Sequence, residues 1–208
     1  MTGPTPELLD DLSDRINSLP AIDRRRLIAV AGPPASGKSK LGAALVARLN
    51  RNHKCAALIP MDGFHLDNCI LTARGWFTRK GAPETFDAAG FIHMIQRLVT
   101  DEEVVIPVFD RARDIAIAGA QTVDTHTTIA VVEGNYLLLN EPPWASLQAL
   151  WDLSVNLDVP SGEIERRSIQ RWLAQGMPPE EAEARARSND LPNAVRVIDN
   201  SKPADIVI

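Results

Sequence analysis

Residues 27–39 of the chain read Leu27-Ile28-Ala29-Val30-Ala31-Gly32-Pro33-Pro34-Ala35-Ser36-Gly37-Lys38-Ser39. A short aliphatic run ends in Gly, four residues, Gly, Lys and Ser, and a helical pattern begins after it. A strand before such a loop and a helix after it are the context of a phosphate-binding loop. Gly32 and Gly37 let the backbone approach phosphate oxygens, and the helix N-terminus adds unpaired N–H groups. We therefore expect the chain to bind a nucleoside triphosphate.

Each part of this loop has an expected role toward the nucleotide. Lys38 can reach the β- and γ-phosphates, and the hydroxyl of Ser39 can ligate the Mg²⁺ ion that nucleotides carry. The residues expected to bind the nucleotide are Gly32, Pro33, Ala35, Ser36, Gly37, Lys38, Ser39 and Lys40.

The composition is that of an ordinary soluble globular protein, which we expect to be a single domain over residues 1–208. Hydrophobic residues make up 45% and charged residues 24%, and the net charge of -5 argues against a nucleic-acid binder. The N-terminus is acidic and amphipathic rather than a signal peptide, and no apolar run approaches the roughly 20 residues of a bilayer crossing. We expect a cytoplasmic protein without membrane insertion.

Apolar runs alternate with helical patterns along the chain, which predicts an α/β fold: a three-layer, doubly wound parallel sheet of the P-loop NTPase (kinase) type. Residues 68–86 are aromatic, basic and glycine-containing, and we interpret this covering segment as lying over the substrate. The predicted strands are 27–31, 56–61, 104–109, 128–132, 153–159, 195–198 and 206–208. The predicted helices are 5–18, 38–51, 87–100, 142–150 and a helical lid over about 161–188.

Two carboxylates follow predicted strands at the edge of the sheet where ligands bind. Asp62 is our candidate for the general base that accepts the proton of the attacking hydroxyl, and it is a further candidate for metal binding. Glu133 is the candidate magnesium-site acid beside Ser39. The alternatives are a helix-capping role for Asp62 and a buried ion pair with an arginine for Glu133.

Several other polar residues have both a functional and a structural interpretation. Arg166, Arg167 and Arg171 could form a lid that clamps the phosphates, or a solvated helix face in which Glu163 pairs with Arg167. Arg111 and Arg113 could bind an anionic or hydroxylated substrate, or form salt bridges at a strand end. His65 could line the acceptor pocket, or act as a structural hydrogen-bond donor.

A set of motifs in one order resembles the family of phosphoribulokinase, uridine kinase and bacterial pantothenate kinase. It is closest to a bacterial branch labelled nucleoside/nucleotide kinases or fructose-transport-system kinases. The resemblance covers roughly residues 27–200. The motifs are Gly-Pro-Pro-Ala-Ser-Gly-Lys-Ser at 32–39, Pro-Met-Asp-Gly-Phe-His at 60–65, Gly-Ala-Pro-Glu-Thr-Phe-Asp at 81–87, Pro-Val-Phe-Asp-Arg at 107–111 and Val-Val-Glu-Gly-Asn-Tyr at 131–136.

The resemblance implies ATP and Mg²⁺ as cofactors, a five-stranded parallel core and phosphoryl transfer to a hydroxyl of a small molecule. It implies a catalytic role for Asp62, a Walker-B-type role for Glu133 and phosphate binding by arginines from Arg166 to Arg171. Uridine kinases carry an aromatic hydroxyl where this chain has His65, and pantothenate kinases differ at Asp110-Arg111. The expected catalytic set is Asp62, Lys38, Glu133, Arg167 and Arg171, with Arg166 on the nucleotide, and the expected acceptor contacts are His65, Asp87, Arg111, Arg113 and Tyr136.

The expected function is therefore an ATP-dependent kinase that phosphorylates a small-molecule acceptor, either a fructose-like sugar or a nucleoside. The alternative is a non-catalytic or regulatory ATP-binding protein associated with a transport system. The sequence leaves the oligomeric state open, with a homodimer as one alternative.

Overall fold

The computed structural model describes residues 3–51 and 55–208. The helices are α1 (Pro6–Ser18), α2 (Lys38–Leu49), α3 (Asn68–Ala73), α4 (Ala88–Thr100), α5 (Ser161–Ala174), α6 (Pro179–Arg185) and α7 (Leu191–Asn200). The strands are β1 (Arg26–Ala31), β2 (Ala56–Pro60), β3 (Val104–Asp110), β4 (Ile115–Val123), β5 (Ile129–Gly134), β6 (Leu153–Asn156) and β7 (Ile206–Val207). Short 3₁₀-helices are η1 (Met61–Phe64), η2 (Phe77–Arg79), η3 (Pro83–Thr85) and η4 (Trp144–Leu150), and η5 (Ala186–Asp190) is a π-helix.

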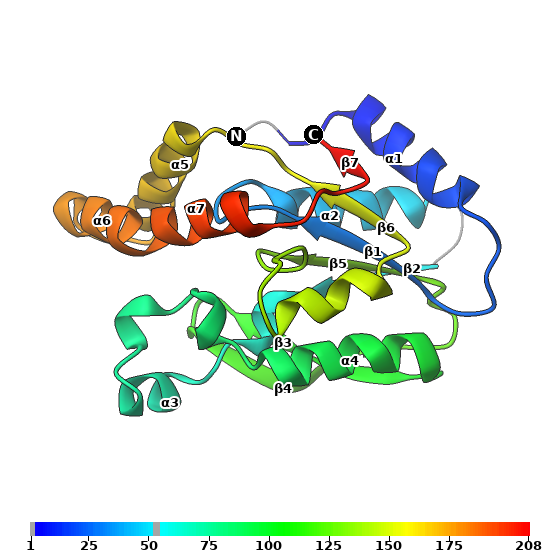
Figure 1. The fold of residues 1–208 in the computed structure, drawn as a ribbon, viewed down its shortest axis with the longest axis horizontal. Helices are drawn as coiled ribbons and strands as arrows, with labels where there is room; N and C mark the ends of the chain where they lie inside the picture. The colour runs from blue at the N-terminus through cyan, green and yellow to red at the C-terminus, as the bar shows by residue number, and fades with distance from the viewer. Residues whose placement is uncertain (1–2, 52–54) are drawn as a thin grey trace.

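A five-stranded parallel sheet in the order β2-β5-β1-β6-β7 forms the centre of the fold (Figure 1). This confirms the predicted parallel core. The central strands β1 and β5 are buried along nearly their whole length, which explains why they read as continuous aliphatic runs.

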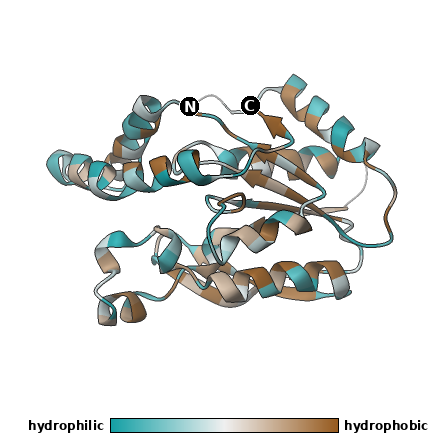
Figure 2. Ribbon diagram, viewed as in Figure 1, coloured by the Kyte–Doolittle hydropathy of each residue, from teal (hydrophilic) through white to brown (hydrophobic). Residues whose placement is uncertain are grey.

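Helices cover both faces of this sheet. Alternate residues of β1 point to opposite faces: Leu27 and Ala29 pack with α4 and η4, whereas Ile28 and Val30 pack with α1 and α2. The strands at the centre are mainly hydrophobic, and the outlying α6 is mainly hydrophilic (Figure 2). The predicted three-layer α/β architecture is therefore confirmed.

A second sheet stands apart from the first and was not predicted. The predicted strand 104–109 exists as β3, but it pairs antiparallel with β4 in a two-stranded sheet of its own. The prediction missed β4 because its middle residues, Ala118, Gly119 and Ala120, are small and exposed. They therefore lack the alternation of bulky apolar and polar residues that marks a half-buried strand.

The predicted strand 195–198 was wrong, because these residues belong to α7. Pro192 lies in the first turn of this helix, and Ala194 and Val197 are buried on one face at a spacing of three, while Val195 and Ile198 remain exposed. Packing of that face has overridden the β-propensity of the branched residues. The helical segment that we predicted to end near residue 188 thus continues to Asn200.

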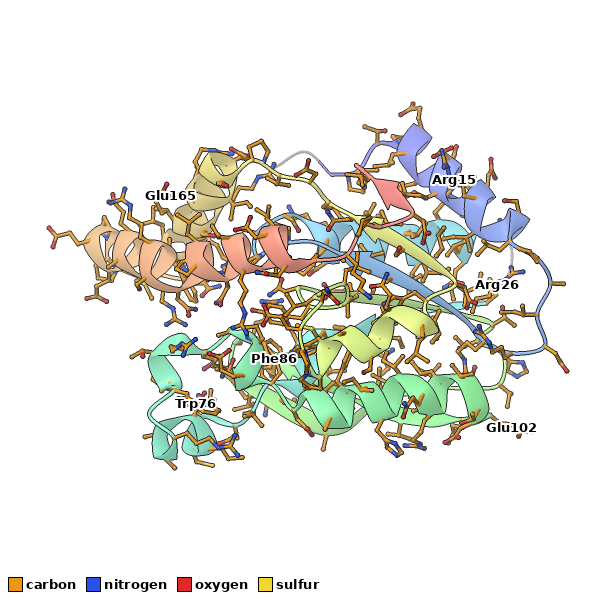
Figure 3. All side chains as sticks on the ribbon, in the orientation of Figure 1. Arg15, Arg26, Trp76, Phe86, Glu102 and Glu165 are labelled. Atoms are coloured by element: carbon orange, nitrogen blue, oxygen red, sulfur yellow. The ribbon has the colours of Figure 1, made fainter. Side chains whose placement is uncertain are left out.

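Arg25, directly before β1, links separate segments of the fold, among them the one that carries Glu102, which is labelled in Figure 3. Its buried guanidinium group donates hydrogen bonds to main-chain carbonyl oxygens from two separate segments. The oxygens belong to Leu98, Asp101 and Glu102 at the end of α4, and to Asp124 and Thr127 before β5. One side chain thus fixes α4 and the entry to β5 against β1.

We expect Arg25→Met to lower the free energy of unfolding by about 2–4 kcal/mol, because it removes a charged donor from several carbonyl groups at once. Urea denaturation followed by circular dichroism measures the loss. The control is Arg113→Met, since Arg113 is exposed and pairs only with Asp110; its change should stay within about 0.5 kcal/mol. Equal effects of the two variants would contradict this role of Arg25.

Candidate active site

The phosphate-binding loop connects β1 to α2 in a tightly wound conformation. Ala35 and Gly37 have positive φ angles of 60° and 104°. A Cβ atom at Gly32 would lie 2.8 Å from Oγ of Ser36 and 3.2 Å from Cβ of Leu157. The loop therefore needs glycine at position 32 for space and at position 37 for its left-handed backbone.

Lys38, Ser39 and Glu133 form a polar cluster beneath this loop. The hydroxyl of Ser39 donates a hydrogen bond to Oε2 of Glu133 at 3.0 Å, and Glu133 is only 4% exposed. Burial lowers the pKa of Lys38, while the carboxylates of Glu133 and Asp62 oppose this shift. Burial likewise raises the pKa of Glu133, against the opposing charge of Lys38. Glu133 thus bonds to Ser39 of the phosphate loop and does not form the buried ion pair with an arginine that was the alternative.

The register of the sheet brings Asp62 to the same place. Glu133 in β5 pairs with Val30 on one side and with Pro60 on the other, so the ends of β1, β5 and β2 lie next to one another. Asp62 follows β2 in η1, and its Oδ2 accepts a hydrogen bond from Nη2 of Arg111 at 2.5 Å. Its carboxylate therefore pairs with a cation rather than capping a helix.

Arg111 reaches Asp62 because the β3–β4 hairpin packs closely on η1. A Cβ atom at Gly63 would lie 2.4 Å from the carbonyl oxygen of Pro107 in β3. Only glycine allows this approach, which explains the Asp-Gly sequence at positions 62 and 63.

A cavity of about 740 Å³ extends from the phosphate loop, past Asp62 and Arg111, to helices α5, α6 and α7, the segment predicted as a lid. His65 lies in its wall between the rings of Phe86 and Phe109, with centroid distances of 4.0 and 4.7 Å. Burial lowers the pKa of His65, against the attraction of Asp62. Of the residues predicted from sequence, the cavity brings together Ala35, Gly37, Lys38, Ser39, Lys40, Asp62, His65, Arg111 and Arg171.

The three lid arginines have three different environments. Arg171 lines the cavity and pairs with Asp190 at 3.0 Å. Arg167 donates to the carbonyl oxygen of Ser36 at 3.1 Å and so braces the phosphate loop from α5. Arg166 lies on an exposed face, paired with Glu163, and does not line the cavity.

The predicted pair of Glu163 with Arg167 is present, at 2.6 Å. Glu163 also bonds to Arg166, and hydrogen bonds from these two arginines lower the pKa of Glu163 to about 2. Its carboxylate therefore stays ionised and holds Arg167 in place against the loop.

Asp87, Arg113 and Tyr136 are not brought to the cavity. Asp87 caps α4 by accepting from the backbone N–H of Gly90 at 2.9 Å, and Arg113 pairs with Asp110. Tyr136 is fully buried and donates its hydroxyl to the carbonyl oxygen of Gly81. Burial raises the pKa of this phenol, so it stays protonated as a donor. In this structure Asp87 and Tyr136 have structural roles, and Arg113 lies in an exposed ion pair outside the cavity.

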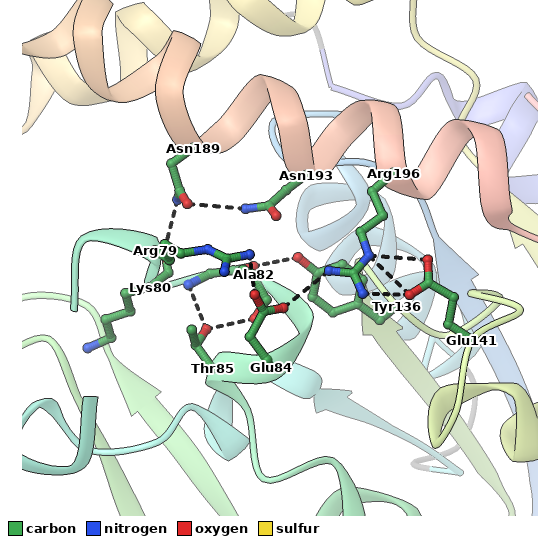
Figure 4. Close-up of polar contacts among 11 residues, drawn as sticks. Arg79, Lys80, Ala82, Glu84, Thr85, Tyr136, Glu141, Asn189, Asn193 and Arg196 are labelled. Carbon is green, nitrogen blue, oxygen red and sulfur yellow. Dashed lines mark hydrogen bonds and ion pairs between the residues drawn. The ribbon is translucent and has the colours of Figure 1, made fainter. Parts of the chain in front are cut away.

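Sequence analysis missed the contacts that join the lid to the covering segment over the cavity. Arg185 donates to the carbonyl oxygens of Thr78 and Lys80, the second at 3.0 Å, and Asn189 donates to the same oxygen of Lys80 at 3.0 Å. Asn193 bonds in turn to Asn189 (Figure 4). No sequence pattern marks the contacts of Arg185 and Asn189, because their acceptors are main-chain atoms.

A chain of alternating charges runs beside these contacts (Figure 4). Arg196 of α7 bridges Glu84 in the covering segment, at 3.2 Å, and Glu141, at 2.5 Å. Arg79 pairs with the other oxygen of Glu84. This network fixes residues 79–84 beneath α7 and thereby closes one side of the cavity.

The donors beside the phosphate loop fit a magnesium ion that is held largely by the nucleotide. Protein sites for Mg²⁺ commonly supply one or two oxygen ligands and leave the rest to phosphates and water. Ser39 and the buried Glu133 present a hydroxyl and a carboxylate 3.0 Å apart, and Ser39 and Asp62 line the same cavity. Within residues 3–51 and 55–208 there is no group of three or more His, Cys, Asp or Glu that would hold a metal unaided.

Comparison with known proteins identifies relatives along nearly the whole chain. The "Putative uridine kinase C227.14" of Schizosaccharomyces pombe is 35% identical, over 99% of this chain and 92% of its own length. A pantothenate kinase of Mycolicibacterium vanbaalenii is 31% identical over 71% of this chain and 48% of its own. The crystal structure of a "putative fructose transport system kinase" from Silicibacter sp. TM1040 superimposes with a TM-score of 0.92 at 45% identity, covering 99% of this chain and 100% of its own.

A scan against protein-family models finds no match. In the described part of the chain, no helix combines the length and apolar character that crossing a membrane requires.

We expect Tyr136→Phe to lower the free energy of unfolding by about 1–2 kcal/mol, because the buried carbonyl of Gly81 loses its donor. ATP affinity and turnover should change less than about threefold, since the hydroxyl lies outside the cavity. Thermal denaturation and ATP titration calorimetry measure the two effects. A large loss of turnover at unchanged stability would instead place Tyr136 at the acceptor.

Proposed function

The chain belongs to the P-loop kinase family that includes uridine kinase, pantothenate kinase and phosphoribulokinase, and we propose that it transfers the γ-phosphate of ATP to a hydroxyl of a fructose-like sugar or a nucleoside. The observation that carries this proposal is the position of Asp62. Its carboxylate lies in the wall of the same cavity as Lys38 and the phosphate loop, held there by Arg111.

In the proposed reaction, Asp62 accepts the proton of the acceptor hydroxyl while that oxygen forms a bond to the γ-phosphorus. The bond between the γ-phosphorus and the β–γ bridging oxygen breaks, and ADP leaves. Arg111 orients the carboxylate of Asp62 toward the acceptor. Proton removal by a positioned carboxylate contributes typically 10²–10⁴ in rate.

The remaining charged groups stabilise the phosphates rather than react. Lys38 and the backbone N–H groups of the loop bind the β- and γ-phosphates, and Arg171 approaches them from the lid. Arg167 keeps the loop in shape through its bond to Ser36. Ser39 and Glu133 would hold Mg²⁺, directly or through water, and the bound ion would neutralise charge on the β- and γ-oxygens.

We further propose that residues 1–208 act as one catalytic domain in which the helical segment from Ser161 onward serves as the lid. The alternative, a regulatory ATP-binding protein associated with transport, does not need a carboxylate facing the γ-phosphate. The pairing of Asp62 with Arg111 inside the cavity therefore favours the kinase.

We expect Asp62→Asn to lower kcat by about 10²–10⁴ and to leave the Kd for ATP nearly unchanged, because the amide cannot accept the proton. A coupled ADP-release assay and ATP calorimetry measure the two quantities. Asp110→Asn is the matched control, because Asp110 pairs with Arg113 and does not line the cavity. Turnover of Asp62→Asn at the control's level would refute the base assignment.

We expect Lys38→Ala to reduce ATP affinity and turnover together, each by at least about tenfold, because Lys38 binds the phosphates in both ground and transition states. The same two assays apply, with the exposed Lys202→Ala as the control. Unaltered activity of Lys38→Ala would contradict the assignment of the phosphate loop.

A further inference from the structure

We call the side of the cavity lined by His65 and Phe109 its acceptor side. Lys80 lies on this side, and all three N–H donors of its ammonium group are in use. An ammonium group has three donors. Those of Lys80 go to Oδ1 of Asn68 at 2.7 Å, to Oδ2 of Asp114 at 2.9 Å and to the carbonyl oxygen of Asp114 at 2.9 Å. Its side chain is only 10% exposed and lies over the ring of Phe109. Lys80 therefore has no donor left for a ligand.

The other acidic residues of the cavity wall are also paired with a cation of the same wall. Asp62 is bound to Arg111 at 2.5 Å, and Asp190 is bound to Arg171 at 3.0 Å. With Asp114 and Lys80, this makes three acids and three cations that compensate one another.

The cations left over lie at the phosphate loop or hold the main chain. Lys38 and Lys40 lie in the first turn of α2, directly after the phosphate loop, and line the cavity there. Arg185 donates to the carbonyl oxygens of Thr78 and Lys80, which fix its guanidinium group on the covering segment. Among the described residues, the cations on the acceptor side of the cavity thus each pair with an acid or donate to main-chain carbonyl oxygens.

His65 offers the acceptor a different interaction. Its Nδ1 lies 2.8 Å from the carbonyl oxygen of Asp62, which can only accept, so this nitrogen carries the hydrogen. In the neutral ring Nε2 is then a hydrogen-bond acceptor, and no described residue donates to it. The rings of Phe86 and Phe109 hold the imidazole in this orientation.

We propose that the acceptor is an uncharged polyhydroxylated molecule, which donates one hydroxyl hydrogen bond to Nε2 of His65 while another hydroxyl is phosphorylated. An anionic acceptor would bring a further negative charge beside Asp62 and the transferring phosphoryl group, where Arg111 already pairs with Asp62. This inference rests on the proposed kinase function, and it adds that a charged acceptor is disfavoured and that His65 binds the acceptor.

The test compares acceptors that differ in charge, using the coupled ADP-release assay with Mg-ATP and the intact protein. The matched pairs are pantothenol with pantothenate, glycerol with glycerate, D-fructose with D-fructose 6-phosphate, and uridine with uridine 5′-monophosphate. We expect turnover within the neutral set, with kcat/KM at least about tenfold above that of the anionic partner.

A charge variant makes the test independent of acceptor shape. Asp114→Asn removes the carboxylate that compensates Lys80, and Asn suits the positive φ angle of 55° at this position. We expect the ratio of kcat/KM for an anionic acceptor to that for its neutral partner to rise about fivefold or more. Asp110→Asn makes the same change of charge outside the cavity and should leave the ratio unaltered.

The histidine contact is tested by His65→Phe, which keeps an aromatic ring between Phe86 and Phe109 but removes the nitrogen acceptor. We expect KM for the neutral acceptor to rise about tenfold or more, with the Kd for ATP unchanged by calorimetry. An unchanged KM would refute the contact.

The outcomes separate this inference from the function on which it rests. Preference for the anionic member of a pair, with clear turnover, would overturn the neutral acceptor and leave the kinase intact. ADP release that no acceptor raises above background, in a protein that binds ATP, would refute the kinase function and the inference with it.

Discussion

The hydrogen-bonded register of β1, β5 and β2 is the constraint on which the site depends. Glu133 pairs with Val30 and Pro60, so the phosphate loop after β1, the acid in β5 and Asp62 after β2 converge at one edge of the sheet. A shift of one residue would turn every side chain of a strand to the opposite face. The aliphatic residues buried on both faces fix the register, so packing and chemistry are set together.

The sequence predicts the parts of the site that lie next to strand ends along the chain. A glycine-rich loop between a strand and a helix, and carboxylates directly after buried strands, are local patterns with a physical cause. The positions of Lys38, Asp62 and Glu133 followed from them. The close contact between η1 and β3 at Gly63 positions His65 and Arg111, and a side chain at Gly63 would prevent it.

The residue roles and elements that the sequence did not predict depend on contacts between distant segments, and no local sequence pattern encodes such contacts. Tyr136 and Asp87 belong to the motifs that carry the resemblance to the kinase family, yet Tyr136 holds Gly81 and Asp87 caps α4. β4 escaped prediction because its exposed residues are small, and α7 because its branched residues favour strands until its buried face is known. Roles within a motif, as these cases show, become separable only once neighbours in space are known.

The lid contacts to the carbonyl oxygens of Thr78 and Lys80 have a consequence for how such proteins diversify. Main-chain acceptors are the same whatever side chain they carry, so Arg185 and Asn189 can dock on residues 78–80 regardless of their identity. Substitution of Thr78 or Lys80 therefore leaves these main-chain contacts in place. Because Thr78 and Lys80 also line the cavity, their side chains can change the surface that the cavity presents while the lid stays docked on the same backbone.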